Sequence, residues 1–155
     1  MKKHYFLLLC LLFSCSSMDR LQPTKKEGYN KRISSVVIFD NASETSEKQK
    51  NEVLIHLRKR FTKDGIKNTS IITGGESLFS PSEIEAKINQ IKPGFYLEID
   101  DVAQKGTTYG RIIKYEVVLT DLKSKDQVWK LYLWSRSPES FAQAIYYNLV
   151  KSKLI

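Results

Sequence analysis

The apolar positions after residue 33 follow a strand period first and a helix period next. Val36-Val37-Ile38-Phe39 is an unbroken apolar run that ends at Asp40, which is typical of a strand buried on both faces. From Asn41 to Asp64 the apolar residues recur at helical spacing, so a long helix is predicted there. The stripe of that helix consists of Val53, Leu54, Leu57 and Phe61. Gly65 can end the helix in the left-handed conformation, and residues 70–73 predict a second short strand.

A second helix is predicted from residue 81 to about residue 91. Ser80 is the expected N-cap, Pro81 suits the first helical position, and Glu83 completes a capping box. Ile84, Ile88 and Ile91 then share one face, which we expect to be buried against the sheet.

The second half of the chain predicts three strands and a closing helix. The strands are residues 95–102, 111–120 and 127–135, all of which alternate between apolar and polar positions. The last two are separated by a polar segment and therefore predict a hairpin. Ser137-Pro138 repeats the helix start, and Phe141, Ile145 and Leu149 form the stripe of the final helix.

The resulting order, β-α-β-α-β-β-β-α, predicts an α+β fold. We expect a two-layer α/β sandwich with a mixed five-stranded sheet and three helices on one face. The first two connections are parallel crossovers, and the last three strands form an antiparallel meander. Residues 33–155 are interpreted as a single α/β domain.

The first fifteen residues have the pattern of an export signal. Lys2 and Lys3 form a positive n-region, and residues 5–13 supply about nine apolar positions, far fewer than the roughly 20 that span a bilayer. Leu12-Phe13-Ser14-Cys15 resembles the bacterial lipobox. The resemblance implies a signal peptide of residues 1–14 and acyl chains, such as palmitate, on Cys15. An ordinary secretory signal with a chance cysteine is the alternative.

Residues 15–32 are interpreted as a lipidated cysteine followed by a flexible basic tether. This segment holds Pro23, Gly28 and several basic residues, and it has little apolar periodicity. Ser16, rather than Asp, follows the cysteine, which under the enterobacterial sorting rule favours the outer membrane, facing the periplasm.

Charge and cysteine content narrow the function classes. The full chain has 25 Lys and Arg, and removal of the signal peptide takes away Lys2 and Lys3. The remaining 23 basic residues against 17 Asp and Glu give a net charge of +6. An exported, lipid-anchored chain meets anionic headgroups rather than nucleic acid, although solvated surface lysines are the alternative reading. Cys10 and Cys15 are the two cysteines, so the folded part has neither a thiol nucleophile nor a thiolate metal cluster.

The remaining polar motifs predict no catalytic residues, no metal and no cofactor. His56 is the one histidine after the signal, which is too few for a zinc site, and no Gly-x-Ser-x-Gly elbow is present. Asp100 and Asp101 are adjacent on a strand, so their side chains point to opposite faces. Gly74-Gly75 precedes no phosphate-binding motif.

Aromatic residues gather in the second half of the chain and suggest an interaction surface. On the strand 127–135, alternation places Trp129 with Leu131 and Leu133 on one face. Val128, Lys130, Tyr132 and Trp134 share the other face. If the first face meets the helices, Lys130, Tyr132 and Trp134 lie on the open side of the sheet, where they are candidate partner-binding residues. Burial of these side chains beneath the tether is the alternative.

The order of elements resembles the small α/β domain shared by several envelope lipoproteins and by the amino-terminal domain of the Tol-system periplasmic protein. The features that carry the resemblance are the run 36–40, the meander segment 119–129 and the closing segment 149–155. The resemblance implies a protein-binding or assembly module rather than an enzyme. The sequence is therefore interpreted as a lipid-anchored envelope protein with an envelope protein partner. A binder of a small amphiphile or glycan on the aromatic sheet face is the alternative.

Overall fold

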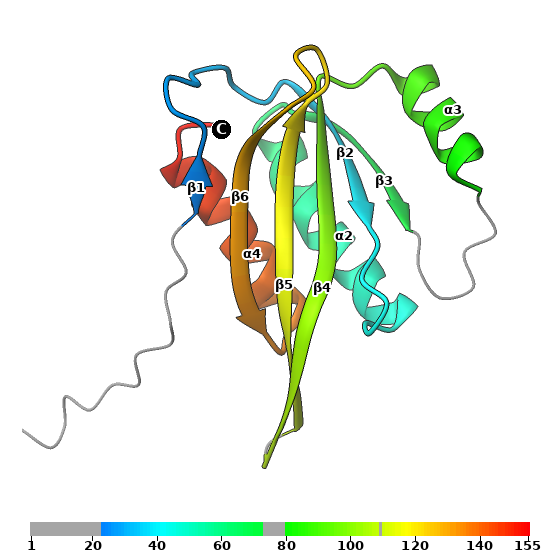
Figure 1. Ribbon diagram of the computed structural model, residues 1–155, viewed down its shortest axis with the longest axis vertical. Helices are drawn as coiled ribbons and strands as arrows, with labels where there is room; N and C mark the ends of the chain where they lie inside the picture. The colour runs from blue at the N-terminus through cyan, green and yellow to red at the C-terminus, as the bar shows by residue number, and fades with distance from the viewer. Residues whose placement is uncertain (1–22, 73–79, 109) are drawn as a thin grey trace, which may run out of the picture.

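The computed structural model describes residues 23–72, 80–108 and 110–155, and its elements follow the predicted order (Figure 1). The strands are β1 (Thr24–Lys25), β2 (Ser35–Asp40), β3 (Lys67–Ile72), β4 (Phe95–Thr107), β5 (Gly110–Asp121) and β6 (Asp126–Ser135). The helices are α2 (Glu47–Lys63), α3 (Pro81–Ile91) and α4 (Pro138–Lys151). From β2 onward the order is the one expected, and β1 is an additional strand.

The strands form one six-stranded sheet in the order β1-β6-β5-β4-β2-β3. β2 pairs in parallel with β3 and β4, whereas β4, β5 and β6 form the predicted antiparallel meander. The sixth strand was not predicted because β1 has only two residues, too few for a hydrophobic period to appear.

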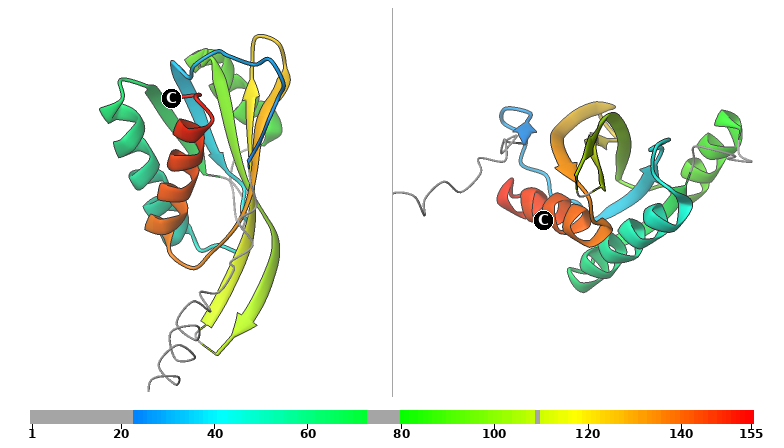
Figure 2. Two further views of the ribbon diagram at one scale, coloured as in Figure 1. Left: turned by 90° about the vertical axis from the view of Figure 1, so that its left-hand side faces the viewer. Right: turned by 90° about the horizontal axis from the view of Figure 1, so that it is seen from below.

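Helices α2 and α4 cover one face of the sheet and enclose the main core (Figure 2). The predicted stripe of α2 is buried there, as are Phe141, Ile145 and Leu149 of α4. From β2, Val36 and Ile38 point into this core.

Helix α3 lies on the opposite face, so the prediction of three helices on one face is wrong. Ile88 of α3 packs with Val37, Phe39 and Tyr96 in a separate small cluster. The reason is topological: the first crossover steps outward from β2 to β3, and the second returns across β2 to β4. Two right-handed crossovers that move in opposite directions along a sheet place their helices on opposite faces.

The helix ends follow the chemistry expected of them. Ser80 and Glu83 form the predicted capping box of α3, and Ser46 with Gln49 forms a second box at the start of α2. Gly65 follows α2 with φ +74°, as a left-handed helix end requires.

Residues 23–32, which the sequence assigns to the tether, lie against the sheet in the structure. β1 extends the sheet beside β6, and the Lys26 N–H donates to the Val128 carbonyl over 2.9 Å. The Tyr29 hydroxyl donates to Asp121 Oδ2 over 2.9 Å. This segment therefore continues the plane of the sheet and does not cover its open face (Figure 2).

Beyond the sheet, β4 and β5 continue together as a long hairpin that projects past β6 and α4 (Figure 1). Within residues 23–72, 80–108 and 110–155, no helix combines the length and the apolarity needed to span a bilayer.

Candidate functional site

The predicted side chains Lys130, Tyr132 and Trp134 lie on the open face of the sheet, away from α2 and α4. All three are partly exposed, whereas Trp129 and Leu131, at alternate positions of the same strand, are buried in the main core. The prediction for the orientation of β6 is therefore confirmed for these residues. We call Lys105, Lys114, Glu116, Lys130, Tyr132 and Trp134 the open-face cluster.

Val128 is the exception to the predicted alternation. It is fully buried in the main core together with Trp129, its neighbour in sequence. The cause is a register shift between β5 and β6, where Leu119 pairs with Trp129 but Thr120 pairs with Gln127. Val128 is thus the extra residue of a bulge, which turns its side chain inward.

Glu116 is the centre of the open-face cluster. It lies on β5 directly opposite Tyr132 and next to the pair formed by Val118 and Lys130. Its Oε1 atom accepts hydrogen bonds from Lys130 Nζ, over 2.7 Å, and from the Tyr132 hydroxyl. One carboxylate therefore fixes two of the three predicted side chains.

Lysine ammonium groups lie over both aromatic rings. Lys114 Nζ is 5.1 Å and Lys130 Nζ 5.6 Å from the centroid of the Tyr132 ring. Lys105 Nζ, from the projecting part of β4, is 5.0 Å from the centroid of the Trp134 ring. These distances are within the range of cation–π attraction. The cluster is therefore an ordered row of rings and cations across three strands.

The electrostatics of the cluster follow from these contacts. Hydrogen bonds from Lys130 and Tyr132 lower the pKa of Glu116, and the bond to Glu116 raises the pKa of Lys130. Glu98 lies on the same face of β4, where burial and the nearby Asp100 and Glu116 raise its pKa. The cluster therefore places one carboxylate, on β5, among lysines from β4, β5 and β6, and two further carboxylates, Glu98 and Asp100, lie nearby on β4.

The acidic pair on β4 has a structural role that the sequence did not reveal. Asp101 accepts hydrogen bonds from the backbone N–H of Glu44, over 2.9 Å, and from that of Ser43. Asp100 accepts one from Asn41 Nδ2 over 2.9 Å. The two carboxylates therefore hold the loop between β2 and α2, each from its own side of the strand.

Asp40 and Lys50 are the buried charges nearest to this loop, each only 2% exposed. Burial raises the pKa of Asp40 to about 6, although the Ala42 N–H and the charge of Lys50 act in the opposite direction. Burial of Lys50 could not be predicted from the sequence, because a lysine on a helix normally faces solvent.

The other motifs considered in the sequence are His56, the acidic residues and the Gly74-Gly75 pair. His56 is half-buried on α2, and no three His, Cys, Asp or Glu side chains of the described segments are grouped as metal ligands would be. A cleft of about 10 Å³ lies between the starts of α2 and α4, lined by Thr45, Tyr115 and Phe141 among others. It has room for about one water molecule. Cys15 and Gly74-Gly75 lie outside the described residues.

Comparisons with known proteins identify the fold. No family model and no curated protein match the chain. Among solved structures, the PelC dodecamer from Paraburkholderia phytofirmans is similar, with 12% identity, a TM-score of 0.53, and coverage of 83% of this chain and 93% of that one. The LpoB C-terminal domain from Salmonella enterica is 9% identical, with a TM-score of 0.46 and coverage of 72% and 87%. Lipoprotein GNA1162 from Neisseria meningitidis is 9% identical, with a TM-score of 0.42 and coverage of 77% and 96%.

At these identities the similarity to PelC shows a shared fold and nothing about function, and the other two alignments are looser still. The small α/β fold expected from the sequence is thereby confirmed. The more specific resemblance to the Tol-system protein stays a prediction.

Proposed function

We propose that this chain is a non-enzymatic, lipid-anchored envelope protein whose open sheet face docks a protein partner. The observation that carries the proposal is the open-face cluster, in which partly exposed rings are held in a row by cations. Tyrosine and tryptophan side chains are enriched where protein interfaces are strongest. Rings already fixed by neighbours lose little conformational entropy on binding.

The face is also accessible in the parts that the structure describes. α2 and α4 occupy the other side of the sheet, and α3 packs over β2, away from β6. Residues 23–32 extend the edge of the sheet instead of covering this face. A partner could therefore approach Tyr132 and Trp134 without any rearrangement of the described elements.

The partner is either another envelope protein or a second copy of this chain. PelC, which shares the fold, assembles as a dodecamer, so self-association is the first case to test. A binder of a small amphiphile or glycan receives less support. The rings of Tyr132 and Trp134 lie beside each other on a sheet, whereas small-molecule sites are usually concave.

The test is photo-crosslinking in intact cells from a probe at residue 134, followed by mass spectrometry. The matched control is the same probe at Tyr147, which is 63% exposed on α4 in the other layer. We expect one reproducible partner, or the chain itself, from position 134 and not from position 147. Capture should fall when Lys130→Glu breaks the contact with Glu116. Equal capture from both positions would show that the open face is not the docking surface.

The anchor is a separate part of the proposal, resting on the lipobox at Cys15. We propose two acyl chains on this cysteine and a location at the outer membrane, facing the periplasm. Cys15→Ala should then move the protein out of the membrane fraction, because two chains give a stable anchor. Intact mass spectrometry of the wild-type protein checks this directly, and an unmodified Cys15 would overturn it.

A further inference from the structure

The net positive charge of the domain is concentrated at one end. All three helices end there, because α2, α3 and α4 each run toward the turn between β5 and β6 (Figure 1). The basic side chains of this end are Lys25, Lys26, Lys31, Arg32, Arg60, Lys63, Lys67, Lys92, Lys123, Lys125, Lys151 and Lys153. The acidic ones are Glu27, Asp64, Asp121 and Asp126. We call this surface the basic end.

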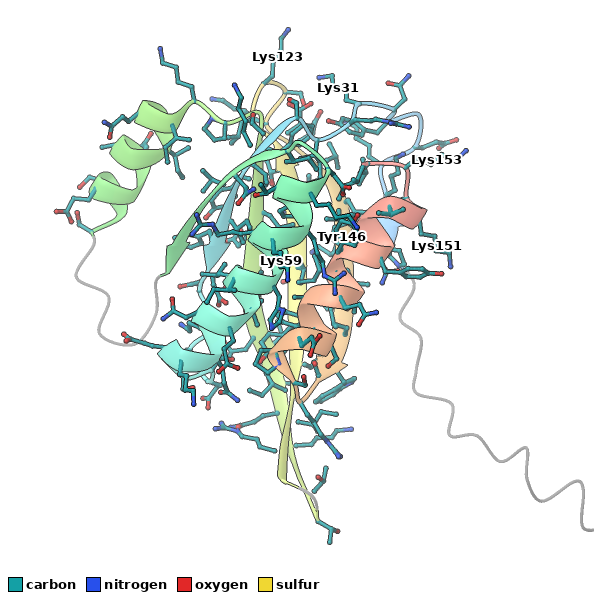
Figure 3. All side chains as sticks on the ribbon, turned by 180° about the vertical axis from the view of Figure 1, so that it is seen from behind. Lys31, Lys59, Lys123, Tyr146, Lys151 and Lys153 are labelled. Carbon is teal, nitrogen blue, oxygen red and sulfur yellow. The ribbon has the colours of Figure 1, made fainter. Side chains whose placement is uncertain are left out.

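The rest of the described chain is close to neutral, since its basic and acidic side chains are nearly equal in number. Figure 3 shows Lys31, Lys123 and Lys153 together at the basic end, with Lys151 just below on α4. Two of the acidic residues there are already paired, Asp126 with Lys26 at 2.7 Å and Asp121 with Lys31 at 2.8 Å. Most of the other lysines of this end thus face solvent with few opposing charges.

Backbone conformation gives a second, independent observation. Among the described residues, the non-glycine positions with positive φ are Lys92 (49°), Lys125 (59°) and Lys153 (57°). All three belong to the basic end, and all three are exposed. Left-handed backbone is strained for a residue with a Cβ, and Gly or Asn is the usual choice. The backbone of Lys92 is strained for a further reason, because a residue that precedes a proline, here Pro93, favours extended backbone.

Gly28 and Gly65 also adopt left-handed backbone at this end of the molecule, and there the favoured residue is present. Gly65 ends α2 in the same left-handed conformation that Lys153 adopts after α4. At three other left-handed turns of the same surface, a lysine takes the place of the favoured residue. Strain retained in this way is typical of a functional position, here one that needs positive charge.

The number of residues between Cys15 and the described part limits which surfaces of the domain can contact the membrane. Residues 15–22 precede the described part, and eight residues reach at most about 28 Å. From Thr24, which pairs with Lys130, the basic end is about four strand residues away, or about 14 Å. The tip of the β4–β5 hairpin is about twice as far in the other direction. An anchor at Cys15 therefore brings the basic end to the bilayer more easily than the hairpin.

From these observations we infer that the basic end binds the anionic lipid headgroups of the membrane that holds the anchor. This inference rests on the proposed lipid anchor. In this orientation the strands would point away from the bilayer, and the β4–β5 hairpin would be the part farthest from it. The open-face cluster would remain accessible to a partner that lies beside the domain. A basic residue close to such a surface contributes roughly fivefold in affinity, so three residues contribute up to about a hundredfold.

The experiment uses the chain from residue 15 onward with Cys15→Ser, so that binding cannot depend on acyl chains. Sedimentation is measured with phosphatidylcholine vesicles, with and without phosphatidylglycerol, at low and high salt. We expect binding only to the anionic vesicles and its loss at high salt. The triple variant Lys92→Gly, Lys125→Gly and Lys153→Gly should bind at least tenfold more weakly, yet melt at the same temperature or higher.

The matched control removes the same charge from α2, as Lys48→Gln, Arg58→Gln and Lys59→Gln, and should bind like the parent chain. If the glycine variant folds poorly, Asn at the same three positions gives an uncharged alternative that tolerates left-handed backbone. Absence of binding by the parent chain, or an equal loss in the α2 control, would overturn the inference. Neither result would affect acylation of Cys15 or crosslinking from residue 134, so the two proposals fail separately.

Discussion

Gly65 and Lys153 occupy the same position at the ends of two helices. Each follows its helix in the left-handed conformation, with φ +74° and +57°. Each is followed by a buried residue whose N–H returns to the helix, Ile66 to the Phe61 carbonyl at 2.9 Å and Leu154 to the Leu149 carbonyl at 3.1 Å. These are two Schellman motifs with one backbone geometry and two different residues at the strained position.

The pair predicts opposite effects of two substitutions on stability. Lys153→Gly should raise the free energy of unfolding by about 0.5–1 kcal/mol, because the left-handed strain of a side chain is removed. Gly65→Ala should lower the free energy of unfolding by about 1 kcal/mol, because alanine is strained in left-handed backbone. A Cβ at residue 65 would meet no atom within 4 Å, so no steric clash adds to this cost. Urea unfolding of both variants provides the measurement. A loss of stability in Lys153→Gly would mean that the lysine side chain supports the fold itself.

The sequence correctly predicted the helices and strands that have strong local signals. It did not predict features that depend on how these elements pack against one another. The capping box at Ser80 and the buried run 36–39 were correct because capping and two-sided burial are local properties. The face of α3 was not, since it depends on which side of β2 receives β4.

The candidate site shows the same limit. Alternation correctly placed Lys130, Tyr132 and Trp134 on the open face. Glu116 and Lys114, which organise them, come from β5, and their register against β6 is set by a bulge that has no sequence signature of its own. Cross-strand partners are therefore the part of a site that a single sequence leaves undetermined.

Trp129 is expected to be the most sensitive aromatic residue of β6. It is 1% exposed, packs in the main core, and donates from Nε1 to Ser152 Oγ over 3.0 Å. Trp129→Ala should therefore cost about 3–5 kcal/mol of unfolding free energy. The partly exposed Trp134 is the control, for which Trp134→Ser should cost about 1 kcal/mol or less. Similar losses for the two, in chemical denaturation, would contradict the assignment of the two faces.

Ile88 is expected to matter less than its central position in α3 suggests. It is only half-buried and touches a small cluster with Val37 and Phe39, rather than the main core. Ile88→Ala should cost about 1–2 kcal/mol, below the 2–5 kcal/mol usual for a fully buried aliphatic residue. Ile145→Ala, at a site with no exposure, supplies the comparison and should fall in the higher range. Equal losses would mean that α3 is as much a part of the core as α4.

The buried carboxyl of Asp40 predicts how stability changes with pH. Its pKa is about 6 in the folded protein against 3.8 for an unperturbed aspartate, chiefly because burial disfavours the charged form. Between these two values the folded state binds more protons than the unfolded state, so stability should fall as the pH rises from about 4 to about 6. The full shift corresponds to about 3 kcal/mol. Glu98, whose pKa is also raised, changes stability in the same direction, so the wild-type slope alone does not identify its source.

Asp40→Asn separates the two contributions. The amide oxygen can still accept from the Ala42 N–H, which lies 3.2 Å from Asp40 Oδ1, but residue 40 no longer titrates. We therefore expect urea titrations at several pH values between 4.5 and 7 to show a clearly smaller slope in the variant than in the wild type. The slope is the quantity to compare, because at neutral pH the substitution also removes a negative charge near the buried Lys50. An unchanged slope would show that Asp40 is already ionised throughout this range.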